Sequence, residues 1–265
     1  MHRTVNGTSL YLEDSGGSGP VVFFSHGLLL SCRMFDDQVA ALRDRFRCVA
    51  YDHRGQGRSA DSHERAVSIE TCTADAIALI EQLGAGPVHF VGLSMGGFVG
   101  MRVAARRPDL IASLTLLNTS AEPEEPTHLP RYRTLSTIVR WFGPRIVMGR
   151  VMPILFGHAW LDDPHQQEAR ALWRRRLNGN RRSIVRAVAG VLERDGVAHE
   201  LGRITCPVGI AVGEEDVATP PAQGRSIALA IPGATLTVLP RGGHTSSIEQ
   251  PHAVTRVIES TIARA

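Results

Sequence analysis

The sequence contains no lysine, so all of its positive charge comes from arginine. The formal net charge is only +3, and the chain has no block of like charges and no RNA-binding motif. A chain without lysine also cannot form a phosphate-binding loop that ends in Gly-Lys-Ser or Gly-Lys-Thr. These absences argue against a nucleic-acid partner and against a P-loop nucleotide site.

Long apolar runs and paired cysteines are absent as well. No segment reaches the roughly 18 apolar residues that a membrane span needs, and the N-terminus, MHRTVNGTSLYLEDSG, lacks the apolar region of a signal peptide. The four cysteines stand alone, without a C-x-x-C pair, and no histidine pair has zinc-ligand spacing. We therefore expect a cytoplasmic protein with no membrane partner, no metal and no cofactor. Cys48 and Cys206 border expected strands, so we interpret them as buried reduced thiols.

Strand and helix patterns alternate along most of the 265 residues. Asn6-Gly7, between two short extended segments, predicts a hairpin with a type I′ turn. Continuous apolar runs predict strands that are covered on both faces. The expected strands are 21–26, 48–53, 88–94, 112–118, one within 206–216, and 234–240, and the expected helices are 34–44, 68–83, 96–107, 221–230 and 249–263. Short connections between them imply right-handed crossovers, so we predict an α/β fold with a mostly parallel, doubly wound sheet.

The alternation is interrupted by a helical, arginine-rich stretch at 121–203. We interpret this stretch as a helical cap (lid) inserted at the carboxyl edge of the sheet and not as an independent domain. Residues 1–120 and 204–265 would then form the core.

One serine lies where a strand pattern gives way to a helix pattern. Gly92-Leu93-Ser94-Met95-Gly96 fits G-x-S-x-G, in which a sharp turn exposes the serine and requires small residues two positions to either side. The helix that follows directs its N-terminal amides toward the same place, where they can stabilise an oxyanion. The motif predicts that Ser94 is a nucleophile.

A nucleophilic serine needs a base and a carboxylate that orients the base. In a parallel sheet these groups should lie in loops after the carboxyl ends of strands, and Asp216 and His244 each follow an expected strand. Glu214 and Glu215 are competing acids, and we choose Asp216. The chain order Ser94, Asp216, His244 is the one expected for this type of triad.

Two further loops follow strands. In the loop after the strand at 21–26, the amide of Leu28 can converge with the amide of Met95 to form an oxyanion hole. We interpret His26 as a structural hydrogen-bonding residue. The loop DHRGQGRS at 52–59 is interpreted as a structural turn in which Asp52 and Arg54 form local hydrogen bonds.

These motifs together resemble those of a known family. HGLLLS, DHRGQGRS, GLSMGG, GEEDVATPP and GGHTSSIEQP are similar to successive motifs of the α/β-hydrolase superfamily, from about residue 20 to the end of the chain. They are most similar to the branch that holds bacterial arylesterases, cofactor-free haloperoxidases and 3-oxoadipate enol-lactonases. The resemblance implies an α/β-hydrolase fold in which Ser94 is the nucleophile, His244 the general base and Asp216 its partner. It also implies that Leu28 and Met95 supply the oxyanion amides and that 121–203 covers the substrate pocket.

Departures from related families narrow the activity. The resemblance places a serine where epoxide hydrolases and haloalkane dehalogenases carry an aspartate, which argues against both activities. Leu29 stands where haloperoxidases of this branch tend to have proline, which argues against efficient perhydrolysis. We predict a carboxylic ester hydrolase of the carboxylesterase type (EC 3.1.1) that acts on small to medium apolar substrates. The alternatives are a lactonase similar to 3-oxoadipate enol-lactonase, a carbon–carbon bond hydrolase, a perhydrolase or haloperoxidase, and a slow-turnover signalling receptor. A homo-oligomeric state also stays open.

The cap and the oxyanion loop should determine the choice of substrate. If an arginine of the cap faced the pocket it would favour a carboxylate-bearing substrate such as an enol-lactone, but we interpret the cap arginines as a solvated surface. We expect a small-molecule ester or lactone to contact apolar residues. The candidates are Leu29, Trp141, Met148, Met152, Ile154, Leu155, Phe156 and Val217.

Overall fold

A computed structural model describes residues 1–265 and shows a single eight-stranded sheet in the order β1-β2-β4-β3-β5-β6-β7-β8. β1 pairs with β2 and β2 pairs with β4 in antiparallel fashion, and all other neighbouring strands are parallel. The predicted mostly parallel α/β sheet is thus confirmed. The strands are β1 (His2–Val5), β2 (Thr8–Asp14), β3 (Val21–Ser25), β4 (Arg47–Tyr51), β5 (Val88–Leu93), β6 (Ile111–Leu117), β7 (Val208–Gly213) and β8 (Thr235–Leu239).

The first two strands form the predicted hairpin. Asn6 and Gly7 have φ values of 44° and 71°, and Val5 pairs with Thr8 across them. Positive φ at both central residues is the signature of a type I′ turn, which suits the twist of the strands that it joins.

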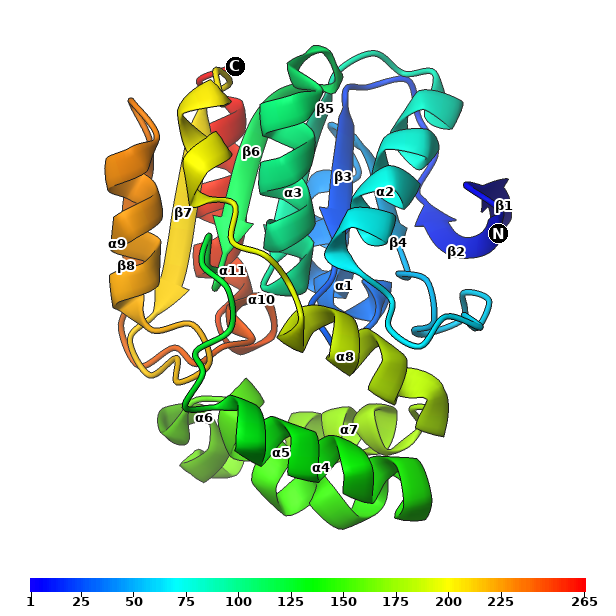
Figure 1. The fold of residues 1–265 in the computed structure, drawn as a ribbon. Coiled ribbons are helices and arrows are strands. Elements are labelled where there is room, and N and C mark those ends of the chain that lie inside the picture. Colours follow the sequence, from blue (N-terminus) through cyan, green and yellow to red (C-terminus); the bar gives the residue numbers. More distant parts are fainter.

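Helices cover both faces of the sheet. The helices of the core are α1 (Asp36–Leu42), α2 (Ile69–Leu83), α3 (Met95–Arg106), α9 (Pro221–Ala230), α10 (Ser246–Glu249) and α11 (Pro251–Ile262). Figure 1 shows α2 and α3 in front of the strands and α1 and α11 behind them. Two apolar layers follow from this arrangement, because alternate residues of each strand point to opposite faces. In β3, Phe23 belongs to the layer with α2 and α3, and its neighbour Phe24 belongs to the layer with α1 and α11.

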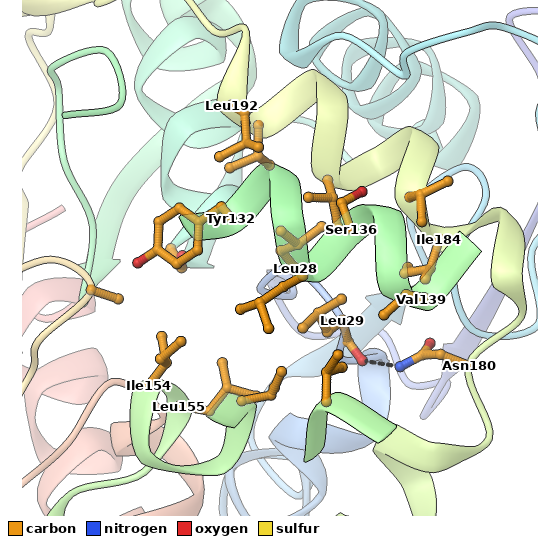
Figure 2. Close-up of a pocket in the computed structure, with 18 of the residues that line it drawn as sticks. Leu28, Leu29, Tyr132, Ser136, Val139, Ile154, Leu155, Asn180, Ile184 and Leu192 are labelled. Carbon is orange, nitrogen blue, oxygen red and sulfur yellow. Dashed lines mark hydrogen bonds between the residues drawn. The ribbon is translucent and has the colours of Figure 1, made fainter. Parts of the chain in front are cut away.

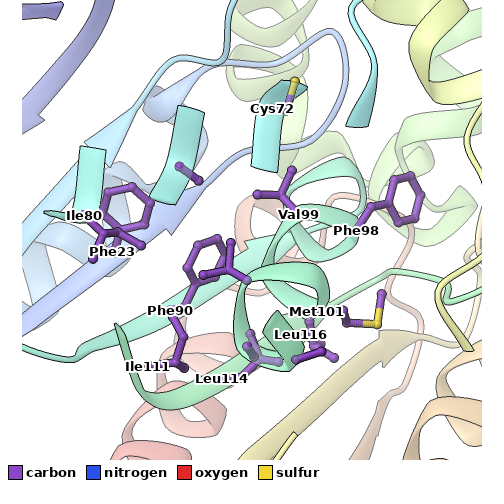
Figure 3. Packing of buried hydrophobic residues seen from close by; sticks show 14 of the residues in the cluster. Phe23, Cys72, Ile80, Phe90, Phe98, Val99, Met101, Ile111, Leu114 and Leu116 are labelled. Atoms are coloured by element: carbon purple, nitrogen blue, oxygen red, sulfur yellow. The ribbon is translucent and has the colours of Figure 1, made fainter. Parts of the chain in front are cut away.

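Figure 3 shows the first of these layers, which contains Phe23 and Phe90 from adjacent strands and Val99 of α3. The rings of Phe23 and Phe90 have centroids 5.5 Å apart. This packing fixes α3, and hence the turn at its start, against the middle of the sheet.

The chain between β6 and β7 contains no strand. Its helices are α4 (Leu129–Phe142), α5 (Met148–Leu155), α6 (His158–Asp162), α7 (Gln167–Asn178) and α8 (Val185–Leu192). Figure 1 shows α4 to α7 below the carboxyl ends of the strands. We call residues 121–203 the cap. Most of its buried apolar residues join the layer of α1 and α11, and a few, such as Val191 and Val197, join the layer of α2 and α3, so the cap and the core share packed side chains.

Candidate active site

Ser94 occupies the turn between β5 and α3 in a strained backbone conformation. Its φ is 53° and its ψ is −113°, which is uncommon for a residue with a side chain. A Cβ at Gly92 would lie 2.4 Å from the carbonyl oxygen of Gly96, and a Cβ at Gly96 would lie 1.9 Å from the carbonyl oxygen of Ser25. Glycine is therefore required at both flanking positions, which is the reason for the spacing seen in the sequence.

The Ser94 hydroxyl has no hydrogen-bonding partner within the protein, whereas its backbone is well anchored. Ser94 N–H donates to the carbonyl of Leu117 at 2.9 Å, and Ser94 carbonyl accepts from the Thr119 hydroxyl at 2.8 Å. The residue is 8% exposed and lines a cavity between the core and the cap. The turn thus presents a free hydroxyl to this cavity.

His244 lines the same cavity and contacts a buried carboxylate. Its Nδ1 lies 3.0 and 2.9 Å from the two carboxylate oxygens of Asp216. Asp216 also accepts hydrogen bonds from Asn118 Nδ2, from the Thr219 hydroxyl and from the amides of Ala218 and Thr219. This leaves His244 Nε2 as the nitrogen that can act as a base.

Asp216 and His244 each stabilise the charged form of the other. Burial alone would raise the pKa of the Asp216 carboxyl, but His244 and the hydrogen-bond donors around the carboxylate hold that pKa below its ordinary value. Burial alone would lower the pKa of His244, but Asp216 holds it above its ordinary value. The two neighbouring acids lie elsewhere. Glu214 accepts from the amide of Arg241, and Glu215 accepts from the amide of Ala159 in the cap.

Of the two residues expected to supply oxyanion amides, Met95 directly follows Ser94 and Leu28 lines the same cavity as Ser94. Met95 is the first residue of α3, so its N–H has no acceptor one turn earlier in the helix. Leu28 N–H donates to no protein group, and Leu28 lines the cavity. His26 Nε2 accepts from the amide of His53 at 2.9 Å, and its Nδ1 donates to the carbonyl of Gly27 at 2.7 Å. His26 is thus a structural residue, as interpreted from the sequence.

Gln56, which sequence reasoning missed, links the two oxyanion segments. Its Oε1 accepts from the amide of Leu29 at 3.0 Å, and its Nε2 lies 3.5 Å from Met95 Sδ. The surrounding turn has the structural role interpreted from the sequence. Asp52 accepts from the amides of Cys32 and Arg58, and Arg54 forms an ion pair with Asp75.

Glu249 was also missed, although it holds the backbone on both sides of His244. Its carboxylate accepts from the amides of Gly243 and Thr245, from the Thr245 hydroxyl, and from the amide of Gly157 in the cap. Burial raises the pKa of Glu249, and these hydrogen bonds oppose the shift. Glu249 therefore ties the loop of His244 to the start of α6.

The cavity between core and cap is mainly apolar. Its volume is about 160 Å³, and 18 of its 26 lining residues are hydrophobic. Figure 2 shows Leu28, Leu29 and Leu155 on one side and Tyr132, Ser136 and Val139 of α4 on another. The spacing of Tyr132, Ser136 and Val139 places them on one face of the helix. Such a cavity accommodates an apolar group next to Ser94.

Four of the eight expected substrate-contacting residues line this cavity: Leu29, Met148, Ile154 and Leu155. Met152 and Phe156 are buried outside it, and Phe156 stacks on Trp160 with ring centroids 4.4 Å apart. Trp141 and Val217 do not line the cavity, and their side chains are 65% and 51% exposed. Trp141 lies two residues beyond Val139 on α4 and so projects from another side of the helix. Val217 points outward from its loop, and Ala218 and Thr219 line the cavity instead.

Sequence reasoning also missed several wall residues, including Phe98, Tyr132, Leu135, Ile184, Val188, Glu124 and Arg194. The helical spacing of Tyr132, Leu135 and Val139 was the available signal for the face of α4. Of the many cap arginines, only Arg194 lines the cavity, and it forms an ion pair with Glu124 at 2.8 Å. Burial lowers the pKa of Arg194, and Glu124 opposes that shift.

No group of three or more His, Cys, Asp or Glu side chains is arranged to hold a metal ion. The four cysteines are unpaired thiols, and Cys206 is only half-buried. None of the helices is both long and apolar enough to span a bilayer.

Residues 21–257 match the model described as "Alpha/beta hydrolase family". A protein from Caulobacter sp., RutD, proposed to be a carbamate hydrolase, is 31% identical over 257 residues that cover 94% of this chain and 93% of the relative.

Two solved structures are also similar. The crystal structure of the enol-lactonase from Burkholderia xenovorans has a TM-score of 0.91 and 29% identity, and the match covers 99% of this chain and 100% of that one. A thermophilic esterase from Thermogutta terrifontis has a TM-score of 0.90 and 29% identity, with 99% and 97% covered.

Proposed function

The chain belongs to the alpha/beta hydrolase family, and from this premise we propose that it is a serine hydrolase that cleaves carboxylic esters with small to medium apolar groups. The observation that supports this proposal most strongly is that Ser94 and the Asp216-bound His244 open on one apolar cavity. The alpha/beta hydrolase fold is shared by relatives named for carbamates, lactones and esters, so the proposed substrate class rests on the cavity.

In the proposed first step, Ser94 Oγ attacks the ester carbonyl while His244 Nε2 accepts the hydroxyl proton. The carbonyl oxygen becomes an oxyanion, which the amides of Leu28 and Met95 stabilise. His244 then donates the proton to the leaving alcohol, and an acyl-enzyme on Ser94 remains. Asp216 stabilises the imidazolium that forms between these steps.

In the second step a water molecule gives its proton to His244 and attacks the acyl carbonyl. The second tetrahedral intermediate collapses, the carboxylic acid leaves, and Ser94 recovers its proton from His244. We propose that the cap, residues 121–203, covers the acyl group and limits the access of solvent. The mechanism needs no metal and no cofactor.

The proposal is tested with 4-nitrophenyl esters of increasing acyl length. We expect Ser94→Ala to lower kcat/KM by about three or more orders of magnitude, since residual catalysis from the oxyanion amides and binding is small. Ser226→Ala, a similar change on the exposed side of α9, serves as the control and should leave kcat/KM unchanged. Undiminished turnover by purified Ser94→Ala protein would contradict the proposal.

Lactone hydrolysis is the second candidate, favoured by the close structural similarity to an enol-lactonase. A lactone is an internal ester, so the same attack opens its ring and the leaving alcohol stays attached to the acyl group. Comparing kcat/KM for neutral linear esters with that for lactones decides the order, and a strong preference for lactones would reverse it.

A further inference from the structure

We propose that Glu124 determines specificity by making the cavity select neutral acyl groups over anionic ones. This inference rests on the proposed ester hydrolysis and names the substrate class more closely. The cavity has an unusual feature, which is a buried ion pair in a mainly apolar wall.

Arg194 is held in place by several contacts. Its Nη1 donates to Glu124 Oε2 at 2.8 Å and to the carbonyl of Val191 at 2.9 Å, and its Nε donates to the carbonyl of Glu122 at 3.2 Å. The guanidinium carbon lies 4.3 Å from the centre of the Phe98 ring. The Arg194 and Glu124 side chains are only 4% and 13% exposed.

The guanidinium keeps spare hydrogen-bonding capacity. Nη2 of Arg194 donates to no protein group, although the rest of the guanidinium is fully engaged. Glu124 Oε1 accepts no hydrogen bond and lies 3.4 Å from His128 Nδ1. One donor and one acceptor are therefore available on a pair of residues that line the cavity.

The pair lies in the wall that surrounds the nucleophile. Phe98, on which Arg194 stacks, is four residues after Ser94 and one turn along α3. Apart from His244, Glu124 and Arg194 are the only residues of charged type among the 26 that line the cavity. Besides the catalytic His244, this pair therefore carries the only full charges in the wall that a charged substrate group would meet.

Because Glu124 neutralises Arg194, an anionic acyl group would lose its hydration and gain no net attraction in return. A neutral group has no such loss, and a carboxamide can accept from Arg194 Nη2 and donate to Glu124 Oε1. Replacing Glu124 by glutamine removes the negative charge but keeps an oxygen that can accept from Nη1. An uncompensated guanidinium would then attract a carboxylate.

The test uses two 4-nitrophenyl esters of pimelic acid, which carry either a carboxylate or a carboxamide at the far end. The two acyl groups have nearly the same shape, so the ratio of their kcat/KM values isolates the effect of charge. For the wild-type protein we expect the carboxamide to be favoured by at least about tenfold, and for Glu124→Gln we expect this ratio to fall at least about tenfold.

Glu200→Gln is the matched control. It removes the charge from another shielded pair, Glu200 with Arg106 at 2.7 Å, whose glutamate is 7% exposed and whose residues lie outside the cavity wall. The ratio should not change in this variant. Arg194→Gln provides a second variant, in which the remaining Glu124 charge should increase the discrimination against the carboxylate.

Failure of this inference differs from failure of the proposed function. If the wild-type protein hydrolyses the carboxamide ester but accepts the carboxylate equally well, the role of Glu124 is refuted, even if no variant folds. An unchanged ratio in folded Glu124→Gln, or an equal change in Glu200→Gln, refutes it as well. Absence of any ester turnover by the wild-type protein refutes the proposed function itself.

Discussion

Replacing Gly96 by alanine tests how tightly the nucleophile turn is built. A Cβ at this position would lie 1.9 Å from the Ser25 carbonyl oxygen, 2.5 Å from its carbonyl carbon and 3.0 Å from its hydroxyl. Real Cβ atoms essentially never approach a neighbour closer than 3.0 Å, so the alanine needs about 1.1 Å more space (3.0 − 1.9). The first contact is a backbone atom of β3, so α3 and its first turn must move away from the sheet.

The expected magnitude combines two opposing effects. Overpacking of this kind destabilises a protein by about 1–3 kcal/mol, and the close backbone contact places Gly96→Ala at the upper end. The higher helix propensity of alanine offsets about 1 kcal/mol. A net loss of about 2 kcal/mol corresponds to a fall in Tm of about 4–8 °C for a domain of this size. Since a displacement of about 1 Å at a reacting group can reduce the rate about a hundredfold, kcat/KM should fall by that order.

The chain offers a matched control in Gly149→Ala on α5. A Cβ there meets no atom within 4 Å, so only the gain in helix propensity, up to about 1 kcal/mol, should remain. Urea unfolding and thermal melts measure the stability of both variants, and 4-nitrophenyl ester hydrolysis measures their kcat/KM. Wild-type stability and turnover in Gly96→Ala would refute the argument that the turn requires glycine at this position.

Two further predictions concern His244. Burial alone would lower the pKa of His244, but Asp216 holds it above the ordinary value for histidine. Because the base must be neutral, kcat/KM should fall as the pH drops through a midpoint above that ordinary value. A pH–rate profile with a midpoint below the ordinary value would contradict this prediction. Glu249→Gln keeps only one of two acceptor oxygens, so we expect kcat to fall about tenfold with a smaller change in KM. The midpoint of the pH profile should also move to a lower pH, because the Glu249 charge raises the pKa of His244. The control is Glu259→Gln, which changes an exposed ion pair. Wild-type kcat and a wild-type midpoint in Glu249→Gln would show that Glu249 does not position His244.

The features that the sequence predicted well are those fixed by local chemistry. The Asn6-Gly7 turn requires positive φ at two successive residues, and the turn around Ser94 requires glycine on both sides, so short motifs carry both signals. The parallel sheet follows from alternating apolar strands and helices with short connections. The choice of Asp216 over Glu214 and Glu215 depended on loop position, and the structure places Asp216 against His244.

The cap was predicted less well, because the direction of its side chains depends on how its helices dock. Trp141 is large and apolar, but α4 directs the face with Tyr132 and Val139 inward and leaves Trp141 in solvent. The cap arginines look alike in the sequence, and only docking distinguishes Arg194 from the others. Glu249 acts on backbone amides, which leave no pattern of side chains to read.

The central claim is that Ser94 attacks the substrate with His244 as its base. Covalent labelling with a fluorophosphonate, followed by intact-protein mass measurement and peptide mapping, tests this claim most directly. We predict one adduct on Ser94, no adduct in Ser94→Ala, and labelling at least about a hundredfold slower in His244→Ala. An adduct on another residue, or labelling of His244→Ala at the wild-type rate, would contradict the account.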